Sequence, residues 1–134
     1  MQVQRAEFPA LLNGHQAARR FFATCFQPGV DDRERLWVAH VDDHARCLDL
    51  ECYEGGPESV DLPVRSIIAA ATRLGSTGLV LAHNHPSGDA RPSGADCRAT
   101  RRLVRAGEPF DLPVLDHLIF AGKACTSMRR LGLL

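Results

Sequence analysis

The segment from His83 to Asp96 contains the side chains whose types and spacing are best suited to chemistry. One residue separates His83 from His85, so on an extended strand both imidazoles point to the same face. Asp96 follows a turn that is rich in proline, serine and glycine. Two imidazole nitrogens and one carboxylate oxygen can bind Zn²⁺ and leave a fourth position open for water, as in catalytic zinc sites. The spacing therefore predicts a zinc site formed by His83, His85 and Asp96.

The end of this segment has a second interpretation. Ser93-Gly94-Ala95-Asp96 is an acidic form of the helix capping box, in which Ser93 caps a helix and Asp96 interacts with it from the third helical position. A His-x-His pair is also a weak indication of a metal site when taken alone. The two interpretations are compatible, because Ser93 can cap a helix and still face a metal. Both roles therefore stay open for Ser93 and Asp96.

The elements that must position these side chains alternate between helices and strands. Glycine and proline mark several of their ends, as at Pro28-Gly29 and Gly75. The run from Gly78 to Ala82 is continuously apolar, which is typical of a strand buried on both faces, and it leads directly into His83. Periodicity predicts helices over 15–26, 63–75 and 94–107, and strands over 36–41, 46–53, 78–82 and 114–121, followed by a short tail. This order predicts an α/β fold, a single-domain layered mixed β-sheet flanked by helices.

Length and composition are those of one globular domain, so we assign residues 1–134 to a single domain with an N-terminal helical segment over 1–30. The chain has 16 basic and 16 acidic residues, and this zero net charge argues against strong attraction to nucleic acid or to an anionic membrane. No apolar run approaches the ~18 residues that cross a bilayer, and the pattern of a signal peptide is absent. The five cysteines include no Cys-x-x-Cys pair, so we expect a reduced, cytoplasmic protein without membrane association.

The motif and its surroundings resemble a known family. His83-x-His85, seven residues, Ser93, two residues and Asp96 is similar to the JAMM motif of MPN-type metalloproteases. More narrowly, His-Asn-His-Pro-Ser-Gly followed by Pro-Ser resembles the bacterial RadC-like JAB domain, and this similarity covers about residues 33–134. The resemblance implies an MPN/JAB-like fold with cytidine-deaminase-like architecture. It also implies zinc-dependent hydrolysis of peptide or isopeptide bonds in a peptide or protein substrate.

The resemblance also implies two catalytic residues beyond the ligands. The family uses a glutamate from an earlier strand as general base, whereas residue types alone leave Glu34, Glu51, Glu54 and Glu58 open. In the family this glutamate comes just before the first core strand, and Arg-Glu-Arg-Leu-Trp-Val over 33–38 is similar to that stretch, which implies Glu34. The serine of the motif, here Ser93, would stabilise the oxyanion together with the metal.

Two polar residues of the predicted strand over 114–121 have a less specific meaning. Asp116 and His117 either lie beside the site or are polar groups of the core, and we favour the core. Other zinc chemistries lack their motifs in this sequence. The nucleobase deaminases require Pro-Cys-x-x-Cys, and a large group of metalloproteases requires His-Glu-x-x-His.

A stripe of arginines supports a different function. Arg98, Arg101, Arg102 and Arg105 recur at helical spacing, so one helix face could contact phosphates and DNA is a candidate partner. Such a stripe is more often a solvated helix face, and the zero net charge weakens the case for DNA. The alternative to a hydrolase is therefore a DNA-associated RadC-like protein whose metal site is structural or non-catalytic.

Overall fold

A mixed β-sheet forms the middle of the protein, in a computed structural model that describes residues 10–26, 33–54 and 62–134. The strands are β1 (Arg35–Val41), β2 (Cys47–Glu54), β3 (Gly78–Asn84), β4 (Val114–Ala121) and β5 (Ala124–Ser127). They lie in the order β2-β1-β3-β4-β5. The central pair β3 and β4 is parallel, whereas β1 is antiparallel to β2 and β3, and β5 is antiparallel to β4.

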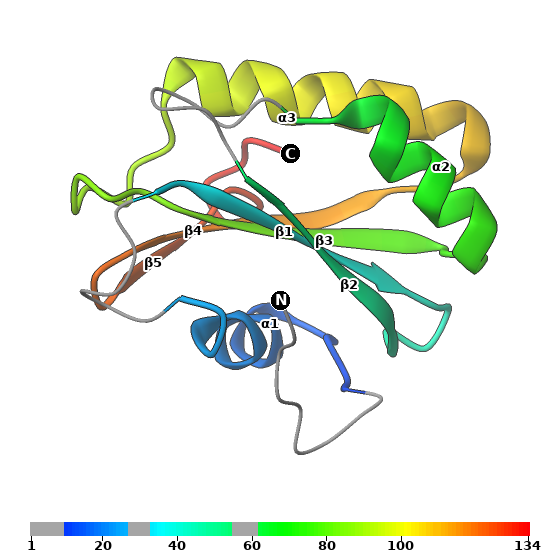
Figure 1. Cartoon of the computed structure of the whole chain (residues 1–134), viewed down its shortest axis with the longest axis horizontal. Coiled ribbons are helices and arrows are strands. Elements are labelled where there is room, and N and C mark those ends of the chain that lie inside the picture. The colour runs from blue at the N-terminus through cyan, green and yellow to red at the C-terminus, as the bar shows by residue number, and fades with distance from the viewer. Residues whose placement is uncertain (1–9, 27–32, 55–61) are drawn as a thin grey trace.

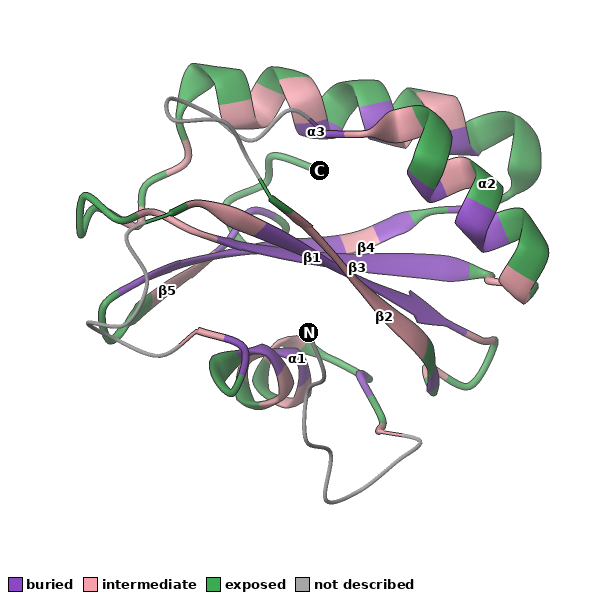
Figure 2. Ribbon diagram, viewed as in Figure 1, coloured by how far each residue is buried: buried purple, intermediate pink, exposed green. Residues whose placement is uncertain are grey.

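Helices cover both faces of this sheet (Figure 1). They are α1 (His15–Ala23), α2 (Val64–Leu74), α3 (Gly94–Gly107) and a single turn of 3-10 helix, η1 (Glu108–Phe110). Helices α2 and α3 lie on one face and α1 lies on the other, and the outer sides of the helices are exposed (Figure 2). Within the described ranges, no helix has the length and hydropathy needed to cross a membrane. The arrangement confirms the predicted single-domain α/β fold with a mixed sheet.

Strand β3 is buried on both faces, which explains its continuous run of apolar residues. Leu79 and Leu81 pack into the core beneath α2 and α3, whereas Val80 and Ala82 pack into the core against α1. His83 is next in this alternation, so its side chain lies on the same face of the sheet as Leu81. The strand period thereby places the first histidine of the motif beneath the helix that carries the aspartate.

Most of the predicted elements form close to their predicted bounds. Strands β1 and β2 make an antiparallel hairpin. Gly75 ends α2 in the left-handed conformation, with φ 68°. Helix α1 is shorter than predicted, because it ends at Ala23 rather than at Phe26. Pro28-Gly29, the expected end signal for that helix, lies outside the described residues.

The C-terminal tail corrects the sequence prediction, because it contains the edge strand β5. Gly122 and Lys123 form a two-residue turn between Ala121 and Ala124, which are paired across the hairpin. Gly122 has φ 58°, the left-handed conformation that two-residue hairpin turns require. The strand itself has only 4 residues, too few to give a recognisable alternation in the sequence.

Candidate metal centre

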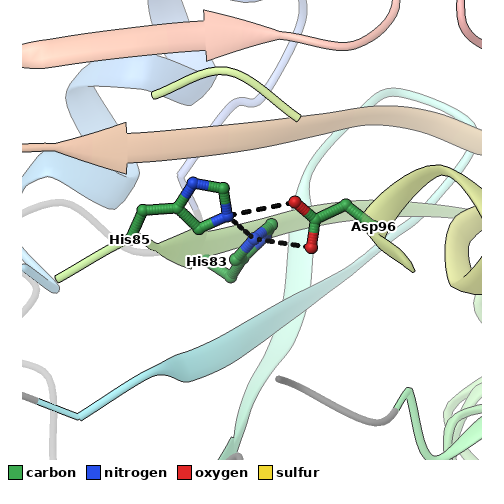
Figure 3. Close-up of side chains that lie close together, drawn as sticks. All are labelled: His83, His85 and Asp96. Atoms are coloured by element: carbon green, nitrogen blue, oxygen red, sulfur yellow. Dashed lines mark hydrogen bonds and ion pairs between the residues drawn. The ribbon is translucent and has the colours of Figure 1, made fainter. Parts of the chain in front are cut away.

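Three polar side chains converge where β3 ends and α3 begins (Figure 3). His83 belongs to the end of β3, His85 follows that strand, and Asp96 lies in the first turn of α3. The Nε2 atoms of His83 and His85 are 2.9 Å apart. The Asp96 carboxylate faces both rings, with Oδ1 3.3 Å from His83 Nε2 and Oδ2 3.0 Å from His85 Nε2. Their ligand atoms lie within 4.8 Å of one another, so one metal ion can contact all three residues.

The helix cap and the candidate ligand set share the same carboxylate. Ser93 Oγ accepts a hydrogen bond from the Asp96 amide at 3.0 Å, and Asp96 Oδ2 accepts one from the Ser93 amide at 2.8 Å. This is the complete capping box at the start of α3. The same Oδ2 atom lies beside His85, so the cap holds the carboxylate in the orientation that faces the imidazoles. The two interpretations of the sequence therefore describe one arrangement.

A backbone carbonyl orients His85. His85 Nδ1 lies 2.7 Å from the carbonyl oxygen of Asp89, and a carbonyl can only accept, so Nδ1 carries the proton. In the neutral ring Nε2 then has a lone pair, which faces Asp96. The Asp89 side chain is bound by Arg91, whose Nη2 lies 2.7 Å from Oδ2, and these contacts lower the pKa of Asp89 to about 2. The ion pair between Asp89 and Arg91 thus holds together the loop that presents the Asp89 carbonyl to His85.

A second histidine and a threonine lie behind His83. His83 Nδ1 is 2.7 Å from His117 Nε2, and His117 Nδ1 is 2.8 Å from Thr100 Oγ1. Burial lowers the pKa of His117 well below its ordinary value, which favours the neutral ring. Its neighbour Asp116 instead accepts from the backbone amide of His117 and from the hydroxyl of Ser127. Of these two polar residues expected in the core, His117 contacts the candidate site and Asp116 bonds to the groups named above.

The charges in the site favour a cation between its three side chains. Burial opposes ionisation of the Asp96 carboxyl, but hydrogen bonds with His83, His85 and the Ser93 amide outweigh it and hold the pKa well below its usual range. The hydrogen bond with Asp96 raises the pKa of His85, and burial partly opposes this effect. With Nδ1 protonated towards Asp89, Nε2 of a neutral His85 ring would be an acceptor 3.0 Å from a carboxylate oxygen, so this approach requires either a second proton on the ring or a metal ion between the two atoms. Two nitrogens and one carboxylate are a donor set that zinc accepts.

Strand register brings Glu34 to the same place. In the antiparallel pair of β1 and β3, Leu36 lies opposite His83. Glu34 comes two residues before Leu36, and His85 comes two residues after His83. In an antiparallel pair these positions lie opposite each other, with side chains on the same face of the sheet as His83. The charge of Glu34 adds to the larger effect of Asp96 in raising the pKa of His85.

The other candidate glutamates lie elsewhere or outside the described residues. Glu51 is bound within the sheet, with Oε1 3.0 Å from Nε2 of the buried His40. The Glu54 side chain, on the edge strand β2, is 62% exposed. Glu58 lies outside the described residues. Among the described glutamates that the sequence leaves open, Glu34 is the one that lies at the candidate site.

Asn84, the middle residue of the His-x-His motif, fixes the backbone on both sides of Glu34. Its Nδ2 donates to the carbonyl of Arg33 at 3.0 Å, and its Oδ1 accepts from the amide of Arg35 at 2.8 Å. These bonds hold the beginning of β1 against the end of β3. The sequence alone gives no sign of this role of Asn84, because its partners lie 49 and 51 residues away.

A cavity of about 600 Å³ opens beside these side chains. Ser93 lies in its wall, and the bond from the Asp96 amide uses an acceptor position of Ser93 Oγ, so the hydroxyl proton stays available to a bound group. The cavity is lined by Glu34, His85, Ser87, Asp89, Arg91, Pro92, Ser93, Ala95 and Asp96. The structure therefore gathers all five predicted site residues, with the buried His83 next to the lining histidine, while their roles stay predictions.

A mixed sheet with a His-His-Asp cluster at the end of a central strand is the arrangement expected of a JAB-type domain. A sequence model of the RadC-like JAB domain matches residues 12–133, and the chain belongs to that family. Related UPF0758 proteins occur in Symbiobacterium thermophilum (39% identical over 75% of this chain and 44% of the relative) and Flavobacterium johnsoniae (34% over 87% and 52%). Another is found in Chloroflexus aggregans (36% over 76% and 45%). The chain thus spans about half the length of these curated relatives.

Proposed function

We propose that this domain is a zinc-dependent hydrolase of peptide or isopeptide bonds, with zinc held by His83, His85 and Asp96. The observation that carries the proposal is the convergence of the two Nε2 atoms and the carboxylate, within 4.8 Å, next to a cavity that Glu34 also lines. Membership of the JAB domain family supports the same class of reaction. The donor set favours zinc among the common divalent metals, because imidazole nitrogen is a preferred zinc ligand.

The chain supplies the proton transfers of this reaction. His83, His85 and Asp96 would hold the zinc, which would supply a bound water with a pKa of about 7 and a Lewis acid for the carbonyl. Glu34 takes the proton of the attacking water and delivers it to the leaving amine, the role of a general base that then acts as an acid. The hydroxyl of Ser93 donates to the oxygen that develops negative charge, because the bond that it accepts from the Asp96 amide leaves its proton available.

The proposal is tested with the zinc-loaded wild-type protein and a library of peptides and isopeptide-linked peptides, with release of new amines as the measurement. We expect one zinc per chain and hydrolysis that stops on chelation and returns when zinc is added. Full zinc occupancy without hydrolysis of any library member would contradict the hydrolase and favour a structural metal site. Failure to bind zinc at all would contradict the site itself.

DNA association is the second candidate function, and the surface of α3 favours it. Arg98, Arg101, Arg102 and Arg105 are all exposed, and in the described part of the chain no ion pair is found for them. They recur at helical spacing within α3, whose outer side is exposed (Figure 2). Phosphates would be the natural partners of such a row, and binding would weaken as counterions compete at higher salt.

We expect the quadruple arginine-to-glutamine variant of α3 to lose whatever duplex DNA binding the wild type has at low salt. The matched control replaces four exposed arginines outside α3, namely Arg20, Arg65, Arg73 and Arg130, by glutamine and should retain it. Fluorescence anisotropy with labelled duplex over a salt series measures both. Wild-type protein that does not bind at low salt, or equal losses in the two variants, would reject α3 as a DNA-binding surface.

A further inference from the structure

A chain of buried hydrogen bonds extends from the candidate metal site into the core. It connects His83 to His117 at 2.7 Å, His117 to Thr100 at 2.8 Å, and the Thr100 hydroxyl to the carbonyl of Asp96 at 2.7 Å. His83 and Thr100 are 1% exposed, and His117 is 2% exposed. Because the last acceptor belongs to Asp96, this series of hydrogen bonds begins at one candidate ligand and ends on the backbone of another.

Metal binding by His83 permits only one direction of these bonds. A metal on Nε2 requires a lone pair there, so the proton of the neutral His83 ring lies on Nδ1 and is donated to His117 Nε2. Because His117 Nε2 accepts this bond, the ring proton of His117 lies on Nδ1 and is donated to Thr100 Oγ1. Thr100 Oγ1 accepts that bond and donates a hydrogen bond from its own hydroxyl to the Asp96 carbonyl oxygen, which can only accept.

Thr100 is suited to the end of this chain because a hydroxyl accepts and donates at the same time. It is also 3.8 Å from Met128 Sδ, but a thioether is a weak acceptor, and the carbonyl at 2.7 Å is the better partner. A valine has the same shape and offers no acceptor. The Nδ1–H of His117 would then face a methyl group whenever His83 binds metal, and a buried donor without a partner is costly.

We propose that His117 and Thr100 are positioning residues that fix the tautomer of His83 and keep its Nε2 available to the metal. The inference rests on the proposed metal site and adds the groups that prepare one of its ligands. Changes in such outer partners of metal-binding histidines typically weaken metal binding by 10- to 100-fold. The series of hydrogen bonds also connects the strand and the helix that carry the ligands, since His83 belongs to β3 and Thr100 to α3.

The test compares Thr100→Val with Thr100→Ser, which keeps the hydroxyl, by zinc competition against a chelator of known affinity. We expect Thr100→Val to bind zinc 10- to 100-fold more weakly than wild type, and Thr100→Ser to stay within about threefold. Thermal unfolding without metal is measured in parallel, because a merely structural threonine would change stability and leave zinc affinity unaltered. Wild-type zinc affinity in a folded Thr100→Val protein overturns the proposal.

A second measurement needs no variant and decides the matter even if Thr100→Val does not fold. Long-range ¹H–¹⁵N spectra of the zinc-loaded wild type report which nitrogen of each imidazole is protonated. We expect Nδ1 to be protonated in both His83 and His117. A proton on Nε2 of His117 would overturn the proposed direction of the hydrogen bonds and leave the metal site itself standing. Wild-type protein that binds no zinc overturns the metal site and this inference together.

Discussion

Asp96→Asn is expected to remove the metal while the start of α3 stays intact. The amide oxygen of asparagine can accept the Ser93 amide as Asp96 Oδ2 does at 2.8 Å, so the capping box survives. The amide nitrogen would then face His83 Nε2, at the position where Oδ1 now lies 3.3 Å away, and can donate to it. The negative charge and the anionic ligand are lost, however. Because outer partners of ligands already change affinity by 10- to 100-fold, we expect a loss of more than about 100-fold in zinc affinity.

Ser93→Ala is the matched control, because it removes the hydroxyl that caps α3 and leaves the Asp96 carboxylate with its bond to the backbone amide of residue 93. Loss of a serine N-cap typically lowers the free energy of unfolding by about 1 kcal/mol. We therefore expect Ser93→Ala to bind zinc and to melt at a lower temperature than wild type. For Asp96→Asn we expect zinc to be lost, while the melting temperature measured without metal stays that of wild type. Zinc content after dialysis and circular dichroism measure the two effects separately. If Asp96→Asn holds as much zinc as wild type, Asp96 is only a capping residue.

Glu34→Gln is expected to abolish hydrolysis without releasing the metal. Glutamine has the shape of glutamate but cannot take a proton from water, and general acid–base groups contribute about 10²- to 10⁴-fold to rate. Glu34 is not one of the three converging ligands, so zinc content should equal that of wild type. The measurement is kcat on any substrate found for the wild type, with zinc determined on the same sample.

Glu54→Gln is the control for this change, since Glu54 lies on the neighbouring edge strand with an exposed side chain. Its rate should match that of wild type. A Glu34→Gln protein with the wild-type rate would exclude Glu34 as the general base. A Glu34→Gln protein that has lost zinc would instead make Glu34 part of the metal's surroundings.

Asn84 shows why the position of Glu34 depends on more than its own residue type. The two hydrogen bonds of Asn84 hold the backbone on both sides of Glu34 to the end of β3. Residue types alone could not separate Glu34 from Glu51, and the resemblance to the family selected Glu34. In the structure Glu51 lies beside the buried His40 instead. Which of the two glutamates lies at the site therefore depends on strand pairing between residues that are 49 or more positions apart in the sequence.

Local patterns were predicted well where the backbone period alone decides them. The buried run over 78–82, the hairpin of β1 and β2 and the start of α3 at Ser93 all follow from alternation, turns and caps within a few residues. Strand β5 was missed although the glycine of its turn was visible, because 4 residues give too little alternation. Thr100 was missed as well, although its spacing of four residues from Asp96 is one helical turn.

The sequence by itself determined the candidate ligands, because the strand period aligns His83 with His85 and the capping box orients Asp96 at the start of a helix. The tertiary structure decided which distant groups surround them. Register between β1 and β3 brings Glu34 to His85, and the parallel pairing of β3 with β4 brings His117 behind His83. The physical reason is that periods and caps act over a few residues, whereas register depends on packing of the whole sheet between its helices.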